Sequence, residues 1–527
     1  MTNYITLYDS TLRDGAQTQG VDFNVVDKQE ICAHLDELGI DYIEGGWPGA
    51  NPTDDAFFNT PLKLNKSRIS AFGMTRRPST SAENDPGLNA LINTGVGAIC
   101  IVGKTWDFHV TEALGITLED NLAMIADSIA YIASKNIEVL FDAEHFFDAI
   151  KTNENYALKV IETAYKAGAK WVVLCDTNGG TLPHEIDALV TKATSKVAGE
   201  YLGIHCHNDT ENAVANSLAA VRAGARQIQG TVNGYGERCG NANLISLIPT
   251  LKYKMGYDIG IGDDAMKRIT QIAASLDDRL NRPRYRHAAY VGSSAFAHKG
   301  GLHVSAVLKN PTAYEHIDPE IVGNERLILV SDQAGRSNML NRLKKLGLKI
   351  DDKDPKVTAL LDLIKEQESQ GFAYDSADAS FELLAKRHLA DAPHFFFRVN
   401  YFKVTDERRW ETDDQLITTS EAVVDAMVNQ TVYHERSTGN GPVNALNLAL
   451  KKALSTDYPE LEKIKLVDYK VRIMKPEKGT GAITRVEITS ENDIGKRWTT
   501  IGVSENILDA SYNALKDAFD YYLQLND

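Results

Sequence analysis

Short apolar runs alternate with longer amphipathic segments over the first half of the chain. A short apolar run is typical of a buried strand, and apolar positions at helical spacing are typical of a helix. Strands are expected over residues 4–9, 41–46, 68–74, 96–103, 138–142, 170–175, 202–206 and 225–230. Helices are expected over 26–38, 118–134, 155–167, 184–197, 211–223 and 243–253. This alternation predicts a closed parallel (β/α)8 TIM barrel over residues 1–265.

An open, doubly wound sheet is the alternative fold, because it shows the same alternation of strands and helices. That fold usually carries a glycine-rich phosphate loop directly after its first strand. Here the first strand is followed by Leu-Arg-Asp-Gly-Ala-Gln at 12–17, which does not have that form. The barrel is therefore the favoured architecture.

The pattern changes twice in the second half of the chain. Residues 266–393 are helical and charged, which predicts a helical linker or subdomain, with helices over 264–280, 335–346 and 355–370. Residues 394–527 predict strands at 395–404, 421–435, 464–474, 482–489 and 498–503, and helices at 443–454 and 505–523. Two groups of strands, each followed by a helix, indicate a repeated α+β domain.

Composition and charge limit which classes of binding partner and which cellular compartment are expected. The formal net charge of −16 disfavours nucleic acids and anionic membranes as partners. The N-terminus does not resemble a signal peptide, and no apolar run has the length of a membrane-spanning helix. The five cysteines are scattered, which favours reduced thiols over a disulfide framework. We therefore expect a cytoplasmic protein.

Two histidines and an acidic residue predict a metal site. His205 and His207 lie at the end of an expected strand, and their i, i+2 spacing puts both imidazoles on one face. Asp14 follows the first expected strand, with Arg13 beside it. In a TIM barrel these strand ends meet at one rim, where a carboxylate and two imidazoles suit Mg²⁺, Mn²⁺ or Zn²⁺. The alternative is a pair of surface histidines and an ordinary salt bridge.

Further polar side chains follow other strands at the same expected rim. They are Glu44, Glu144, Asp176, Thr177, Asn178 and the residues of the loop 233–241. Two of them have alternative interpretations. Glu44 either pairs with Arg13 or binds the metal directly. Glu144 is either a catalytic carboxylate or one half of a rim salt bridge.

Three segments carry a family resemblance: LRDGAQ at 12–17, HCHND at 205–209 and NGYGERCGNAN at 233–243. They look like the motifs of the DRE-TIM metallolyase superfamily. Within it, AHKGGLHVSAV at 297–307 resembles the segment that follows the barrel in 2-isopropylmalate, homocitrate and citramalate synthases. YIEGGWPGANPTD at 42–54 and LCDTNGG at 174–180 are most similar to the long citramalate branch of this family.

The resemblance implies a condensation of acetyl-CoA with pyruvate, followed by thioester hydrolysis to citramalate and CoA, as in isoleucine biosynthesis. The implied ligands of the divalent metal are Asp14, His205, His207 and, directly or through water, Asn241. The implied catalytic residues are Arg13, Glu144, His303 and Tyr314. The implied substrate-binding residues are Arg13, Glu144 and Thr177.

Each implied role has a physical reason. Arg13 and the metal would polarise the keto group and stabilise the alkoxide that forms. Thr177 would hold the substrate carboxylate. His303, expected in a loop outside the barrel, would take the proton from the acetyl methyl group with help from Tyr314. The alternative for His303 is an ordinary surface residue.

The last domain resembles the C-terminal regulatory dimer domain of these synthases. That implies a homodimer inhibited by a branched-chain amino acid, isoleucine if the product is citramalate. A dimerisation domain without a ligand is the alternative.

Three other functions stay open at this stage. Asp142 stands where a short-substrate enzyme is expected to present an apolar side chain, so 2-isopropylmalate synthase remains the second candidate. A non-catalytic amino-acid-binding protein and a metal-dependent lyase are less favoured. The complete set of site residues argues against the first, and the segment 297–307 argues against the second.

Overall fold

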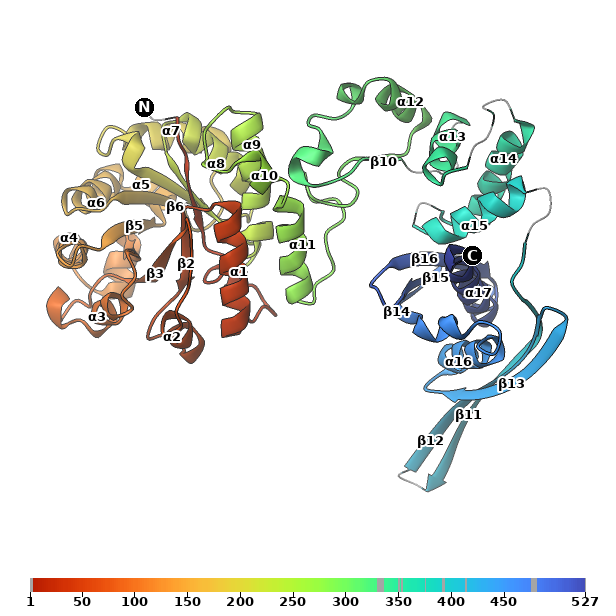
Figure 1. Ribbon diagram of the computed structural model, residues 1–527. Coiled ribbons are helices and arrows are strands. Elements are labelled where there is room, and N and C mark those ends of the chain that lie inside the picture. The colour runs from red at the N-terminus through yellow and green to blue at the C-terminus, as the bar shows by residue number, and fades with distance from the viewer. Residues whose placement is uncertain are drawn as a thin grey trace. The chain divides into compact units, whose positions relative to one another are not determined.

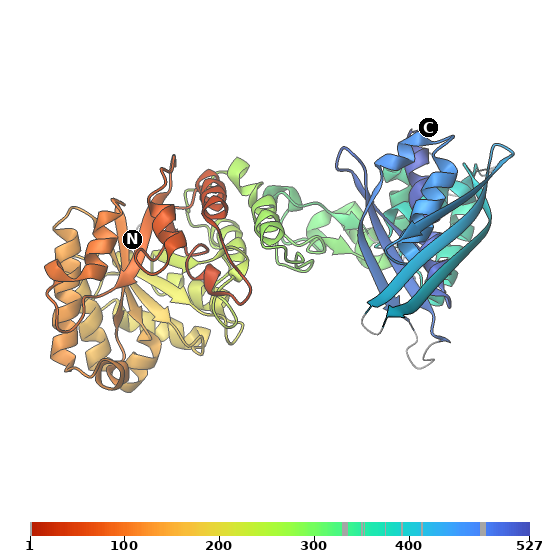
Figure 2. The same ribbon diagram turned by 90° about the horizontal axis from the view of Figure 1, so that it is seen from below.

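The computed structural model describes residues 3–328, 336–348, 351, 354–374, 376–390, 394–412, 415–474 and 481–526. The chain divides into two compact units (Figures 1 and 2). The barrel unit comprises residues 1–296 and 317–326, and the second unit comprises residues 297–316 and 327–527. The expected division into three domains, 1–265, 266–393 and 394–527, follows different boundaries and stays a prediction.

The barrel unit contains a closed parallel barrel of eight strands within the described residues. The strands are β1 (Thr6–Asp9), β2 (Tyr42–Gly46), β3 (Arg68–Met74), β4 (Ala98–Lys104), β5 (Glu138–Glu144), β6 (Trp171–Asp176), β7 (Leu202–Cys206) and β8 (Gln227–Gly230). They pair in sequence order, and β8 closes the barrel on β1 with Ile228 opposite Leu7. The closure confirms the predicted TIM barrel and excludes the open sheet.

Helices follow the strands and cover the outside of the barrel (Figure 1). They include α1 (Val25–Leu38), α2 (Pro52–Phe58), α3 (Pro86–Asn93), α4 (Leu118–Ala133), α5 (Phe146–Thr152), α6 (Glu154–Lys166), α7 (Pro183–Ala193), α8 (Ala213–Arg222) and α9 (Leu244–Tyr253). The helix expected over 264–280 is two helices, α10 (Asp263–Met266) and α11 (Ile269–Arg279). Between them the Arg268 N–H donates to the carbonyl of Ala265, a hydrogen bond to the third residue before it, as in a 3-10 turn.

Both faces of the barrel strands are buried. In β4, Cys100 belongs to the cluster inside the barrel, whereas Ile99 and Ile101 pack in the layer between the barrel and its helices. Such strands appear in the sequence as continuous apolar runs, which is why the pattern located them. In β7, Cys206 packs in the outer layer, so its neighbours His205 and His207 face the interior.

The second unit contains α12 (Gly301–Lys309) and, further along the chain, the helices α13 (Arg336–Lys345), α14 (Pro355–Gln370) and α15 (Asp378–Leu389). Two short strands, β9 (Ala297–His298) and β10 (Leu327–Ile328), pair in parallel. His303 therefore lies on a helix, α12, and the expectation of a loop is wrong. Helix α15, which the sequence pattern missed, packs against the C-terminal part of the same unit.

The C-terminal part of the second unit is a repeat of three antiparallel strands and a helix. The first copy consists of β11 (Arg398–Thr412), β12 (Gln415–Val428), β13 (Thr431–Gly439) and α16 (Pro442–Leu454). The second copy consists of β14 (Lys465–Ile473), β15 (Thr484–Glu491), β16 (Arg497–Ser504) and α17 (Ile507–Asn526). The predicted α+β repeat is confirmed.

One expected strand of this repeat, 421–435, is in fact two. The chain turns at Asn429 and Gln430, which have φ angles of 47° and 70°. Val428 and Thr431 then pair across a two-residue hairpin. Asn429 favours such a turn, but the residue after it is glutamine rather than the glycine of a typical Asn-Gly hairpin, so the signal was weak.

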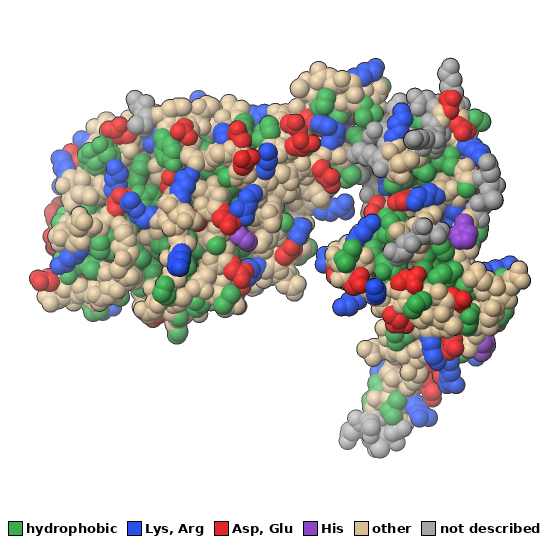
Figure 3. Space-filling view, in the orientation of Figure 1, with side chains coloured by type: hydrophobic (Ala, Val, Ile, Leu, Met, Phe, Trp, Pro, Cys, Tyr) green, Lys and Arg blue, Asp and Glu red, His purple; other side chains and the backbone are tan. Residues whose placement is uncertain are grey.

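Acidic and basic side chains are interspersed over the face seen in Figure 3. Among the described residues, no helix combines the length and the apolar character needed to cross a membrane.

Candidate metal and substrate site

Three buried side chains converge at the carboxyl end of the barrel. Asp14 follows β1, and His205 and His207 lie at the end of β7. The Nε2 atoms of the two histidines are 3.4 Å apart, and His205 Nε2 is 3.6 Å from Asp14 Oδ2. One potential ligand atom from each residue lies within 4.8 Å of the other two. The sequence prediction that these residues come together is confirmed, and together they could hold a metal ion.

Two of these groups are in the protonation state that metal binding requires. Burial alone would raise the pKa of Asp14, but the neighbouring positive charge of Arg13 holds it well below its usual range. Burial and the neighbouring His205 lower the pKa of His207 to about 4. At neutral pH the site therefore offers an ionised carboxylate and a neutral His207 imidazole.

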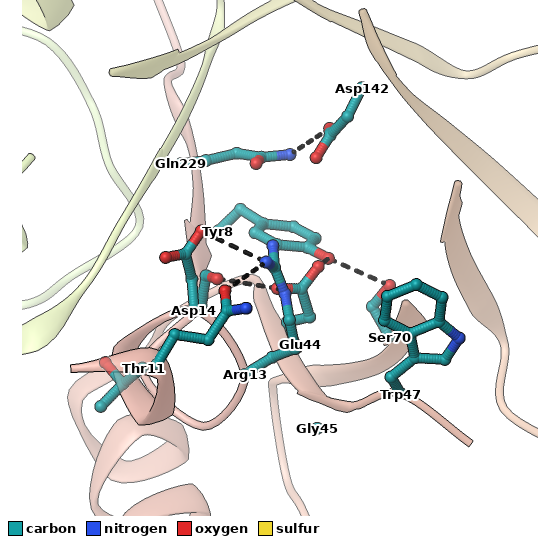
Figure 4. Close-up of polar contacts among 12 residues, drawn as sticks. Tyr8, Thr11, Arg13, Asp14, Glu44, Gly45, Trp47, Ser70, Asp142 and Gln229 are labelled. Carbon is teal, nitrogen blue, oxygen red and sulfur yellow. Dashed lines mark hydrogen bonds and ion pairs between the residues drawn. The ribbon is translucent and has the colours of Figure 1, made fainter. Parts of the chain in front are cut away.

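A buried chain of hydrogen bonds fixes the ring of His205. Gln229 on β8 donates its side-chain Nε2–H to Asp142 Oδ1 at 3.0 Å (Figure 4). Its Oε1 is then the acceptor for His205 Nδ1, at 2.9 Å. The Nδ1 atom carries the proton, and the lone pair of Nε2 faces Asp14 and His207. Asp142 thus supports the ring through Gln229, a role that its sequence position did not reveal.

Asn241 completes the polar group around Asp14. Its Nδ2 donates to Asp14 Oδ1 at 2.9 Å and to the carbonyl of Tyr235 at 3.1 Å. Its Oδ1 is buried and, like His207 Nδ1, has no hydrogen-bond partner among the described residues. The loop passes close to itself, so that a Cβ on Gly236 would lie 2.1 Å from Asn241 Nδ2. The orphaned oxygen and the converging donors fit a divalent cation.

Arg13 is held rigidly beside the three converging groups. Its Nε donates to Glu44 Oε2 at 2.7 Å, and its Nη1 donates to Asp14 Oδ2 at 3.2 Å (Figure 4). The guanidinium also lies 3.8 Å from the ring centroid of Phe72. Glu44 accepts further hydrogen bonds from Tyr8 and the hydroxyl of Ser10. The geometry therefore supports the interpretation that Glu44 pairs with Arg13 rather than binds the metal.

Thr177 follows β6, and its hydroxyl proton has no acceptor among the described residues. The backbone N–H of His145 donates to Thr177 Oγ1 at 2.9 Å, so this oxygen is already an acceptor. His145 adopts a left-handed conformation with φ of 56°, which aims its N–H at Thr177. Glu144, the last residue of β5, forms an ion pair with Lys104 at the end of β4. Sequence reasoning missed both His145 and Lys104, because these contacts depend on packing between strands.

One cavity of about 280 Å³ connects these groups. We call it the site cavity. Its lining is Arg13, Asp14, Gln17, Trp47, Phe72, Met74, Val102, Lys104, Asp142, Glu144, Cys175, Thr177, His205, His207, Glu237 and Arg238. A small polar substrate in this cavity could reach the candidate metal-binding groups, a fixed guanidinium and a hydroxyl donor together.

His303 and Tyr314 belong to the second unit. His303 is exposed on α12, and Tyr314 is 49% exposed after a short 3-10 turn. Their rings stack with centroids 4.1 Å apart. The structure thus brings these two residues together with each other, and their role toward the site cavity stays a prediction.

Family models cover most of the chain. The HMGL-like model matches residues 4–273, which contain the barrel and the site cavity. The model described as homocitrate synthase post-HMGL domain-like matches residues 290–371, which include His303. The LeuA allosteric (dimerisation) domain model matches residues 375–523.

Full-length relatives give a finer assignment. An (R)-citramalate synthase from Aquifex aeolicus is 50% identical, over 100% of this chain and 99% of the relative. One from Geobacter sulfurreducens is 49% identical, over 99% and 98%. A 2-isopropylmalate synthase from Yersinia pestis is 30% identical, over 98% and 95%. The chain therefore belongs to the HMGL-like family and, within it, to the family of (R)-citramalate synthases.

Proposed function

We propose that this chain condenses acetyl-CoA with pyruvate and hydrolyses the product thioester to citramalate and CoA. The methyl carbon of acetyl-CoA loses a proton and forms a bond to C2 of pyruvate. The keto oxygen becomes an alkoxide and takes up a proton, and water then releases CoA from the thioester. The observation that carries this proposal is the convergence of metal ligands, a fixed guanidinium and a hydroxyl donor in one small cavity.

The side chains of the site cavity suit a 2-oxo acid. Thr177 can donate its hydroxyl proton to the substrate carboxylate, because its oxygen already accepts from His145. Arg13 keeps its charge, since Glu44 and Asp14 raise its pKa against the effect of burial. It offers fixed N–H donors that need no reorganisation when negative charge develops on the keto oxygen.

The proposed metal ligands are Asp14, His205 and His207, with Asn241 beside them. A divalent cation bound there supplies a Lewis acid that polarises the keto group. The proposed base for the acetyl methyl group is His303, assisted by Tyr314. Glu144 is proposed to lie near the reacting groups, in competition with its ion pair to Lys104.

The direct test is a thiol-release assay. Purified protein is loaded with Mg²⁺, Mn²⁺ or Zn²⁺ and given acetyl-CoA with pyruvate, 2-oxobutanoate or 2-oxoisovalerate in turn. Free CoA is measured by its thiol, and the product is identified by mass spectrometry. We expect pyruvate to give the highest kcat/KM. A preference for 2-oxoisovalerate would contradict the proposal and favour 2-isopropylmalate synthase.

We also propose that the second unit forms a homodimer and binds a branched-chain amino acid, with isoleucine as the inhibitor. The dimer has support in the exposed apolar side chains on the edge strand β14, among them Val471 at 44% and Ile473 at 55% exposure. Light scattering of Val471→Asp against the unchanged chain tests the dimer. Dose–response curves with isoleucine, leucine and valine test the effector, and equal inhibition by all three would contradict the choice of isoleucine.

A further inference from the structure

Three cavities meet at the carboxyl end of the barrel. The site cavity of about 280 Å³ has a neighbour of about 510 Å³ and another of about 400 Å³. The larger neighbour lies along the ends of β2, β3 and β4. Besides Trp47, it shares Met74, Val102 and the ion-paired Lys104 and Glu144 with the site cavity. The smaller neighbour shares Arg13 and Gln17 with it. Among the described lining residues, Trp47 alone borders all three cavities.

The backbone of Trp47 is anchored by a buried ion pair. Its N–H donates to Asp54 Oδ2 at 2.8 Å, and Asp54 Oδ1 pairs with Lys28. Both charged groups are buried, and Lys28 also donates to the carbonyl of Gly45 at 2.9 Å. A buried charge that loses its partner is costly, so this pair strongly disfavours displacement of the segment.

The glycine before Trp47 is required by the same anchor. Gly46 has a φ of 144°, and a Cβ there would lie 2.5 Å from Asp54 Cγ. The carboxylate can therefore approach the backbone only because position 46 carries no side chain. The sequence Gly-Gly-Trp at 45–47 thus sets the backbone position from which the Trp47 side chain projects.

The indole ring of Trp47 is also held by an aromatic contact with Phe72. It meets the Phe72 ring edge to face, with centroids 5.4 Å apart and an interplanar angle of 83°. Phe72 in turn lies under the guanidinium of Arg13. Figure 4 draws Trp47 together with the Arg13 and Glu44 side chains. An anchored backbone and an aromatic contact make Trp47 a rigid wall element rather than a mobile rim side chain.

We propose that Trp47 determines the substrate size of this enzyme, because it separates the site cavity from the 510 Å³ cavity. This inference rests on the proposed function. Pyruvate places only a methyl group beyond its keto carbon, and the small site cavity suits it. A longer 2-oxo acid would need the space behind Trp47, where the lining is mostly apolar. A single methylene in an apolar pocket changes discrimination by about 10–200-fold, so one wall residue is enough to set the preference.

The test compares substrates within each variant. The ratio of kcat/KM for 2-oxoisovalerate to that for pyruvate is measured for the unchanged chain, Trp47→Phe and Trp47→Ala. We expect the ratio to rise at least about tenfold in Trp47→Ala, with a smaller rise in Trp47→Phe. Trp410→Ala is the matched control, because Trp410 is 64% exposed on the second unit, and its ratio should not change.

Each result bears on the proposal. If both substrates lose kcat/KM equally in Trp47→Ala, Trp47 is a structural residue and the proposal is overturned. If Trp47→Ala does not fold, Met74→Ala tests the same partition, because Met74 borders the same two cavities, and an unchanged ratio there overturns it. A preference of the unchanged chain for 2-oxoisovalerate refutes the proposed function instead, and is recognised before any variant is made.

Discussion

The barrel unit and the second unit bury their strands to very different degrees. Every residue of β6 is buried, and its two faces pack against the barrel interior and the surrounding helices. In β14 of the second unit, by contrast, none of the nine residues is buried. Apolar side chains stand exposed there, whereas the apolar side chains of β6 are covered within their own unit.

This difference in burial suggests that the barrel unit positions the site, whereas the second unit provides a surface for assembly. In a closed barrel every strand is hydrogen-bonded to a strand on each side. Such a barrel can hold polar side chains at one rim in nearly fixed positions, as Asp14, His205 and Thr177 show. An edge strand with exposed apolar groups requires a covering surface, which suits the assembly and regulation proposed for the second unit. Substitutions in the two units should therefore affect different measurements.

The largest effect is expected from loss of a metal ligand in the barrel. His205→Ala should abolish CoA release, because it removes one of three converging ligands while the packed layers of the barrel remain. The variant should keep its circular dichroism spectrum and lose bound metal by elemental analysis. Dialysis of the unchanged chain against a chelator should have the same effect, reversed by added metal.

His34→Ala is a control for this prediction, because His34 lies on α1 and lines none of the cavities described above. Full activity of His205→Ala with normal metal content would show that these residues are not the metal site.

A smaller but still large effect is expected from a residue of the second unit. His303→Ala should lower kcat by roughly 10²–10⁴-fold, the usual contribution of a general base. The KM for pyruvate should change little, since its proposed ligands lie in the barrel. Exchange of the acetyl methyl protons with deuterated solvent should also be lost. A confirmed effect would mean that the second unit contributes a residue to catalysis as well as to assembly.

Persistence of exchange in His303→Ala, together with weaker pyruvate binding, would make His303 a substrate ligand instead. Tyr314→Phe keeps the stacked ring and removes only the hydroxyl, so it separates the stacking contact from proton transfer.

A moderate effect is expected from the support of His205. Gln229→Leu removes both the acceptor for His205 Nδ1 and the donor to Asp142. Metal affinity should fall by about 10–100-fold, as for other groups that orient a metal-binding histidine. Titration of the metal-free protein measures it. Gln227→Leu is the control on the same strand, since the Gln227 side chain has no hydrogen-bond partner among the described residues. Equal affinity in the two variants would refute the orienting role.

The barrel and the convergence of Asp14, His205 and His207 could be predicted from the sequence, and the support around them could not. Strand ends and i, i+2 spacing are local properties, so His205, His207 and Asp14 were recognisable as neighbours. Gln229 could not be found in this way, because its role depends on reaching His205 and Asp142 across the barrel interior. The contact of the His145 N–H with Thr177 was equally hidden, because it depends on one left-handed residue.

In the second unit, sequence prediction failed for a different reason. Helix α15 was missed although its own Ala379 and Leu383 pack in the core of the C-terminal part of the unit. The turn at Asn429 and Gln430 was missed because Asn429, a residue that tolerates the left-handed conformation, was its one local signal, and no glycine follows it. The hairpin forms nonetheless, since the paired strands β12 and β13 pack against α16, where Val424 and Ala426 are buried, and this burial offsets the cost of the turn.

The smallest predicted effect concerns this turn. Gln430 holds a φ of 70°, which costs free energy for any residue with a Cβ. Gln430→Gly should therefore raise the free energy of unfolding of the second unit by about 0.5–1 kcal/mol, after the entropy that glycine loses on folding. The midpoint of its thermal transition should rise by about 1–4 °C, measured by calorimetry, with CoA release unchanged. Gln430→Ala removes the same side chain but keeps the strained backbone, so it should bring no gain. An equal gain in both variants would show that the side chain, rather than the left-handed backbone, destabilises the hairpin, and that the missed turn carries no strain.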